Sequence, residues 1–166
     1  MKKQELLHQI DQTYKNNKNY STPLLTEHTI KTLHSICCPT EKAGTYRTTE
    51  AAPLGKGHKP PHPDEIEHFM HHFMNQMETS NIMFHPVEFA AIAYKRLLDI
   101  FPFETHNEET AALFMNVLLA GEGYPVIDRP SKLEGYEEAM EKARMMPFPD
   151  TDDLTMMIVE EIVRIS

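Results

Sequence analysis

The feature of this sequence that most constrains its fold is a helical stretch that is apolar nearly all round. Residues 107–120 read NEETAALFMNVLLA, and from Ala111 onward apolar side chains fall on almost every face of a 3.6-residue helix. Such a helix has no face to expose to water, so other elements must surround it. We therefore expect residues 107–120 to form the central helix of the molecule, ended by Gly121.

Other segments with helical periodicity would cover this central helix. The pattern predicts about seven helices, among them residues 4–18, a helix capped by Thr26, one that starts at Pro63, one that starts after His85, and a last one near 152–165. Residues 45–58 have no helical period. They run from β-branched and aromatic residues into glycines and prolines, which predicts a small β-hairpin.

The length and hydrophobic content predict a single domain over residues 1–166, in which the helix at 152–165 packs on the rest. The fold class is all-α, a bundle of about seven helices with a small β-hairpin. Asn116 lies within the most apolar helix. A buried amide needs partners, and we expect it to bond with the backbone of an adjacent loop.

Charge and cysteine content exclude several classes of function. The net charge is -9, and no cluster of Lys and Arg exceeds two residues, so binding of nucleic acid or of an anionic membrane is not expected. No apolar run is long enough to span a bilayer, and the first residues lack the apolar core of a signal peptide. A disulfide between the adjacent Cys37 and Cys38 would be strained. We expect a reduced, cytoplasmic protein.

The spacing of three histidines suggests a metal site, but their position on the helix argues against one. His68 and His72 share one helix face, with His71 beside them, as zinc ligands do. They lie opposite the apolar stripe of that helix, and no cysteine or carboxylate is placed to complete a coordination sphere. We expect a solvated polar face and no metal.

The loop at 101–114, FPFETHNEETAALF, has the outline of a phosphate-binding turn, a proline-bent loop that enters a helix. Residues 85–127, HPVEFAAIAYKRLLDIFPFETHNEETAALFMNVLLAGEGYPVI, resemble the core of the Fic domain family (filamentation induced by cyclic AMP). The segments LLTEHTIKTLHSI, GTYR and PPHPDEIEHFMHHFM resemble the family's preceding helix, its flap entry and its following helix. The similarity covers about residues 20–145.

The resemblance implies a helical Fic fold and an activity that transfers AMP from ATP, with Mg²⁺, to hydroxyl side chains of target proteins. The family motif is H-P-F-x-[DE]-G-N-G-R-x-x-R. Its histidine is the general base, its acid holds Mg²⁺, its glycines expose backbone N–H groups, and its arginines neutralise phosphate charge.

This sequence retains the apolar part of the motif and replaces the groups that do chemistry. Pro102, Phe103 and Asn107 match. The base position holds Phe101, the metal-ligand position Thr105, the two glycine positions His106 and Glu108, and the two arginine positions Glu109 and Ala112. At the four positions 105, 108, 109 and 112 the family's net charge of +1 becomes -2 in this sequence, which disfavours ATP. We therefore expect neither ATP nor Mg²⁺ as a cofactor.

The replacements also predict a local structure. Thr105-x-x-Glu108 fits a capping box, and Glu109 adds negative charge in the first helical turn. The N–H groups that hold phosphate in relatives would then be satisfied by the protein's own carboxylate, so we expect a former nucleotide site that caps itself.

Two functions from different classes fit these residues. The first is a non-catalytic or regulatory module that binds a protein partner through the flap, residues 45–58. Its contact residues would be Tyr46, Arg47, Thr48 and Thr49. A hairpin that only covers the core stays as the alternative for that segment, and a homo-oligomer is compatible with it. The second is a divergent transferase in which His106 is a displaced base and Glu104, Glu108 and Glu109 recruit a metal.

Overall fold

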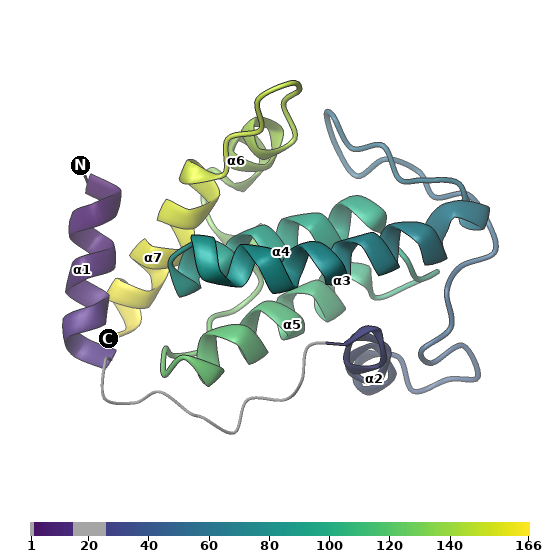
Figure 1. The fold of residues 1–166 in the computed structure, drawn as a ribbon, viewed down its shortest axis with the longest axis horizontal. Helices are drawn as coiled ribbons and strands as arrows, with labels where there is room; N and C mark the ends of the chain where they lie inside the picture. The colour runs from purple at the N-terminus through teal and green to yellow at the C-terminus, as the bar shows by residue number, and fades with distance from the viewer. Residues whose placement is uncertain (1, 15–25) are drawn as a thin grey trace.

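A computed structural model of the 166-residue chain describes residues 2–14 and 26–166. The described part is mostly helical, which confirms the predicted class (Figure 1). Its helices are α1 (Lys2–Tyr14), α2 (Glu27–Cys37), α3 (Ile66–Met83), α4 (Pro86–Ile100), α5 (Asn107–Gly121), α6 (Tyr136–Ala143) and α7 (Asp152–Ile165), with short 3-10 turns at Pro63–Glu65 and Pro130–Lys132. The first helix, predicted over 4–18, runs to Tyr14, and residues 15–18 lie outside the described part.

Helix α5 is the central helix, as its composition predicts. It packs most extensively on α4 and also on α2, and Phe114 and Met115 are fully buried in it. Helix α4 packs on both α3 and α5, and Figure 1 shows α2 across one end of these three helices and α1 and α7 at the other end. Helix α7 packs on α1, α4 and α6.

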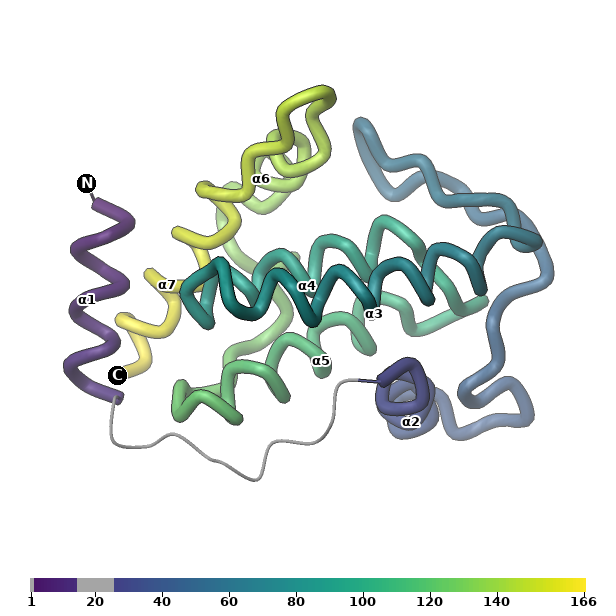
Figure 2. Tube along the Cα trace, viewed as in Figure 1, coloured from purple at the N-terminus to yellow at the C-terminus, as the bar shows by residue number. Residues whose placement is uncertain are grey.

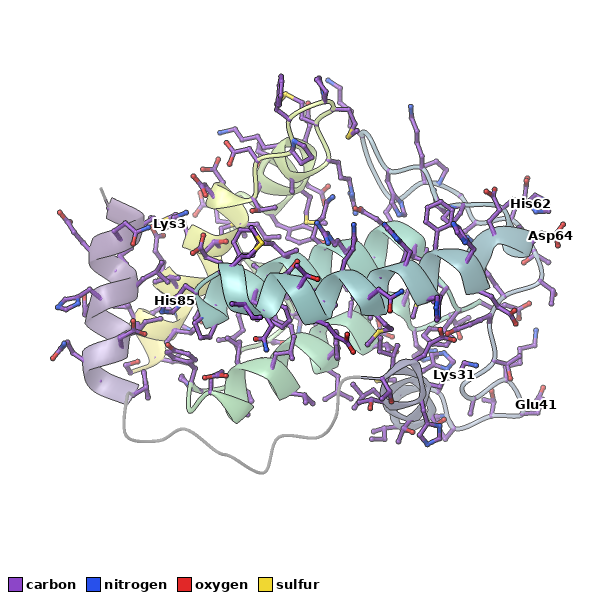
Figure 3. The ribbon with its side chains drawn as sticks, in the orientation of Figure 1. Lys3, Lys31, Glu41, His62, Asp64 and His85 are labelled. Atoms are coloured by element: carbon purple, nitrogen blue, oxygen red, sulfur yellow. The ribbon has the colours of Figure 1, made fainter. Side chains whose placement is uncertain are left out.

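The helix starts follow from their capping residues. Thr26 Oγ1 accepts a hydrogen bond from the N–H of Thr29 at 3.2 Å, as the sequence predicts. At the start of α4, Pro86 occupies the first turn and His85 Nδ1 accepts from the Val87 N–H at 3.1 Å. The other ring nitrogen of His85 lies 2.9 Å from Asp11 of α1, so one residue both begins α4 and joins it to α1 (Figure 3).

The predicted β-hairpin at 45–58 is not present. Among the described residues the segment makes one isolated bridge, Tyr46 with Phe103, and no strand. The Arg47 N–H donates to the Pro102 carbonyl at 2.8 Å, so the backbone partner is the 101–103 loop and not a second strand. Further on, the Leu54 N–H donates to His58 Nδ1 at 2.8 Å, which closes a compact turn. Figure 2 shows the 51–60 segment extending toward the loop after α6, and Lys56 pairs with Glu141 of α6.

Two further findings concern metal binding and membrane crossing. The three histidines of α3, His68, His71 and His72, are exposed, and no group of His, Cys, Asp or Glu in the described ranges is arranged to hold a metal ion. No helix within residues 2–14 and 26–166 has both the length and the apolar character that a membrane crossing requires.

Truncation of a central side chain should show how much of the stability rests on α5. Phe114 is fully buried and meets Phe73 edge to face at 6.3 Å. Phe114→Ala should lower the free energy of unfolding by about 3–5 kcal/mol in urea denaturation. Phe148 is 83% exposed, so Phe148→Ala is the matched control and should change it by less than about 0.5 kcal/mol. Equal losses in the two variants would contradict the central role of α5.

Candidate functional site

The loop between α4 and α5 is bounded by two residues with left-handed backbone. Phe101 ends α4 with φ 52°, and its N–H donates to the Leu97 carbonyl at 3.0 Å. His106 precedes α5 with φ 62°. Left-handed backbone is uncommon outside glycine, so both residues are held there by their surroundings. The loop therefore turns sharply at each end and places residues 102–105 between the two helices.

Asn107 fixes the centre of this loop. Its Oδ1 accepts from the Phe103 N–H at 2.9 Å, and its Nδ2 donates to the Phe103 carbonyl at 2.7 Å. Asn107 is 4% exposed and Phe103 is fully buried. One amide thus satisfies both backbone groups of one buried residue, which explains why an asparagine at this position holds the loop in a single conformation.

His34 of α2 holds the same loop from the other side. Its ring stacks on Phe103 with centroids 3.8 Å apart. The Gly44 N–H donates to Nδ1 at 2.9 Å, so Nδ1 carries no proton, and Nε2–H donates to the Thr105 carbonyl at 3.1 Å. Burial lowers the pKa of His34, which favours this neutral form.

Arg47 is the third residue that holds the loop. The sequence predicted instead that its side chain contacts a protein partner. It is 3% exposed, and its guanidinium donates to the carbonyls of Phe101 at 2.6 Å, Thr49 at 2.9 Å and Pro61 at 2.6 Å. These bonds join the 45–61 segment to the end of α4. The neighbouring side chains of Thr48 and Thr49 are exposed, while Tyr46 donates its hydroxyl to Glu27 at 2.7 Å.

At the base and metal-ligand positions of the motif, the loop presents groups without that chemistry. The Phe101 ring lies edge-on to His58, 5.7 Å between centroids. Thr105 is exposed, and its Oγ1 lies 2.8 Å from His106 Nδ1 and 3.8 Å from Cys38 Sγ. Ala112, at the last arginine position, is 5% exposed and belongs to the core.

The predicted capping box is wrong. His106, not Thr105, is the N-cap of α5, and no side chain caps the helix there. Because His106 takes the left-handed conformation, the helix starts one residue later than a box at Thr105 requires. Glu108 instead accepts from the Ser131 hydroxyl and lies 3.7 Å from Arg129 Nε. The carboxylates at the start of α5 are therefore engaged by the 129–131 segment and not by their own helix.

Arg129 is the residue of this site that the sequence did not indicate. Its Nη1 lies 3.4 Å from Glu109 Oε1, and its Nε faces Glu108. It is positioned by Asn116 of α5, whose Oδ1 accepts from the Ile127 N–H at 3.1 Å and whose Nδ2 donates to the Ile127 carbonyl at 2.8 Å. The expectation that Asn116 satisfies a nearby loop is confirmed. The one signal for Arg129 was that an asparagine on the apolar helix α5, half-buried in the structure, needed a loop partner.

The carboxylates proposed as metal ligands in the divergent transferase are separately paired. Glu104 forms an ion pair with Lys42, whereas Glu108 and Glu109 face Arg129. His106 Nε2 lies 3.9 Å from Glu109. In residues 2–14 and 26–166 no set of three or more such side chains is grouped for a metal.

Comparison with known proteins agrees with this geometry. The Fic/DOC family model matches residues 24–119, more than half of the chain. The chain is 40% identical over 72 residues to a protein adenylyltransferase Fic from Aedes aegypti, covering 43% of this chain and 14% of that protein. It is 36% identical over 104 residues to one from Nematostella vectensis, covering 61% and 24%. The chain spans less than a quarter of the length of these relatives.

A solved structure has the same fold. The crystal structure of a Fic domain containing signaling protein from Bacteroides thetaiotaomicron superimposes with a TM-score of 0.72, at 21% identity, over 98% of this chain and 66% of that one. The shared helical fold and the match to the family model together place the chain in the Fic class. The chain belongs to the Fic/DOC family.

Two neutral histidines should make stability depend on pH. Burial lowers the pKa of His34 and of His58, so between the lowered value and the unfolded value of about 6.5 the unfolded chain binds more protons. Their contribution is complete above pH 6.5 and is lost as pH falls through that range. In urea denaturation, the free energy of unfolding should fall from pH 7 to pH 5, and less steeply in His34→Gln. The exposed His71→Gln should keep the wild-type slope. A wild-type slope in His34→Gln would contradict this assignment.

Proposed function

We propose that this chain is a Fic-family protein that does not transfer AMP and that binds a protein partner beside the 45–49 segment. The observation that carries the proposal is the contrast within one loop. Its backbone is held by Asn107, His34 and Arg47, while its base position holds Phe101. Loss of a general base alone is worth on the order of 10²–10⁴ in rate.

The charges at the start of α5 also oppose nucleotide binding. Two carboxylates, Glu108 and Glu109, stand at the helix N-terminus, and Arg129 neutralises one charge, which leaves -1 over these three residues. A bound triphosphate would have to displace Arg129 or lie against the carboxylates. Partial exposure of these groups weakens the repulsion but does not change its sign.

The surface beside the 45–49 segment supports the proposal that the chain binds a protein partner there. A groove of about 490 Å³ runs along it, lined by Thr45, Tyr46 and Thr48 of the segment, by Lys31 of α2, and by Asp64 and Glu67 near the start of α3. Figure 3 labels Lys31 and Asp64, two of the residues that line it. Because Arg47 fixes the segment from beneath, its polar edge is presented in one conformation. An extended peptide can pair with such an edge.

A divergent transferase is the second candidate, and one observation favours it. His106 is exposed at the start of α5, and its Nδ1 is 2.8 Å from Thr105 Oγ1. An exposed imidazole oriented by a hydroxyl fits a general base. The separate pairing of Glu104 from Glu108 and Glu109 makes a metal beside it less well supported.

Calorimetry with ATP and Mg²⁺ should separate loss of binding from loss of chemistry. We expect wild type to show no binding with a Kd below about 100 μM. Glu108→Gly with Glu109→Arg changes the local charge by three units and frees the start of α5, so this double variant should bind ATP. Labelled AMP transfer should stay absent until Phe101→His and Thr105→Asp are added, because the base and the metal ligand are separate requirements.

The matched control is Glu137→Gly with Glu138→Arg, which makes the same charge change in the first turn of α6. It should not bind ATP. Transfer by wild type that disappears in His106→Ala would establish the second candidate instead. A folded double variant of the α5 start that still ignores ATP would mean that charge is not what excludes the nucleotide.

Site-specific photocrosslinking should locate the partner. A photoreactive amino acid at the exposed Thr48 should give a discrete adduct in native lysate, whereas the same group at Thr79, exposed on α3, should not. An excess of unlabelled wild-type protein should remove the Thr48 adduct by competition. Identical adduct patterns at the two positions would contradict a partner surface at 45–49.

A further inference from the structure

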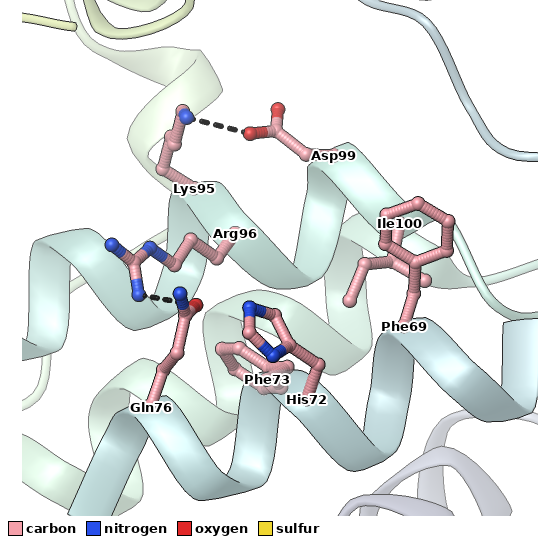
Figure 4. Close-up of a pocket in the computed structure, with 8 residues that line it drawn as sticks. All are labelled: Phe69, His72, Phe73, Gln76, Lys95, Arg96, Asp99 and Ile100. Atoms are coloured by element: carbon pink, nitrogen blue, oxygen red, sulfur yellow. Dashed lines mark hydrogen bonds and ion pairs between the residues drawn. The ribbon is translucent and has the colours of Figure 1, made fainter. Parts of the chain in front are cut away.

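A second hollow lies between α3 and α4, built from residues that the motif loop does not use. Its volume is about 290 Å³, and it is lined by Phe69, His72, Phe73, Gln76, Lys95, Arg96, Asp99 and Ile100 (Figure 4). Phe73 and Ile100 are buried and form an apolar floor, and Phe69 is 39% exposed at the rim. One part of the groove is therefore apolar and aromatic, and another part is charged.

Arg96 is the unusual member of this lining. Its Nη1 donates to Gln76 Oε1 at 2.8 Å, and the described part of the chain offers it no carboxylate within ion-pair distance. By contrast, Arg129, Arg144 and Arg164 each pair with a carboxylate. A guanidinium has five N–H donors, so most of those of Arg96 have no protein acceptor among the described residues.

The guanidinium of Arg96 is partly removed from water, and no carboxylate among the described residues forms an ion pair with it. Burial lowers the pKa of Arg96, and the nearby Asp99 opposes this effect only in part. Asp99 is already shared, because Lys95 Nζ lies 2.7 Å from its Oδ2 and Arg144 Nε lies 2.9 Å from its Oδ1. Lys95, Arg96, Arg144 and Asp99 together carry a local charge of +2, in a chain whose net charge is -9. A partly desolvated cation of this kind favours an anionic ligand.

Arg96 also lines a neighbouring hollow, so a ligand can approach it from a second side. This neighbouring hollow of about 390 Å³ continues along α3, lined by His72, Asn75, Gln76, Thr79, Ser80 and Arg96. Arg96 thus stands between two openings, and Gln76 holds one edge of its guanidinium in place. A ligand can reach the free edge of the guanidinium with its apolar end on Phe73 and Ile100.

We propose that this groove binds an organic carboxylate that carries a short aromatic or apolar group. The carboxylate accepts from the free N–H groups of Arg96, in the two-bond geometry that suits a guanidinium. The apolar group lies on Phe73 and Ile100 beneath the rim of Phe69. A hollow of about 290 Å³ has room for a single ring on a short chain.

An NMR titration of the full chain with 3-phenylpropionate tests the proposal. We expect amide shifts confined to α3 and α4, with a Kd on the order of 1 mM or tighter. The neutral amide 3-phenylpropionamide and the ringless propionate should each bind at least about tenfold more weakly. Arg96→Gln should weaken binding of the acid about tenfold to a hundredfold, and Arg96→Lys should restore it only in part, since lysine lacks the fork.

Arg164→Gln is the matched control, because Arg164 is an exposed arginine of α7 paired with Glu161. It should bind the acid as wild type does. Thermal unfolding of each variant verifies that it is folded. Equal affinity for the acid and the amide, unchanged affinity in a folded Arg96→Gln, or shifts centred on the α5 start would each overturn the proposal.

Discussion

The site depends on two asparagines of α5, each of which satisfies both backbone groups of one residue in a loop. Asn107 does so for Phe103 and Asn116 for Ile127. Loops lack the internal pairing of helices, and a buried unpaired N–H or carbonyl is costly. By supplying both partners from a rigid central helix, the two amides fix the 101–106 loop and the segment that carries Arg129. Together with His34 and Arg47, they position the residues that face the start of α5.

Two histidines and one arginine then replace the pairing that a hairpin would have supplied. His34 accepts from the Gly44 N–H, and His58 accepts from the Leu54 N–H. Arg47 donates to the carbonyls of Thr49 and Pro61 and to that of Phe101 at the end of α4. The 44–61 segment can therefore be ordered without a strand, because side chains satisfy its backbone. Each histidine has to stay neutral to accept on Nδ1, which links the order of this segment to pH.

The sequence predicts the helices well and the contacts between distant segments poorly, for physical reasons. The central position of α5 follows from apolar residues on all its faces, and the start of α4 follows from His85 and Pro86. The capping box failed because the pattern ignores backbone conformation, and His106 takes a left-handed one. The hairpin failed because β-branched residues indicate extended backbone without saying what pairs with it. Arg129 was missed because it reaches Glu109 across twenty residues of chain through a loop with no motif.

The parts of the motif that persist are those that pack. Phe103 and Asn107 are buried and bonded to α2 and α5, so replacing either would disrupt the bundle itself. The positions that differ are 101, 105, 106, 108 and 109, all at least partly exposed, and Ala112, where a small apolar residue fits the core. Side chains that act only on a ligand can change without cost to the fold, while those that hold the loop cannot. If the chain does not transfer AMP, as we propose, a retained backbone with replaced chemical groups is the state that packing alone would preserve.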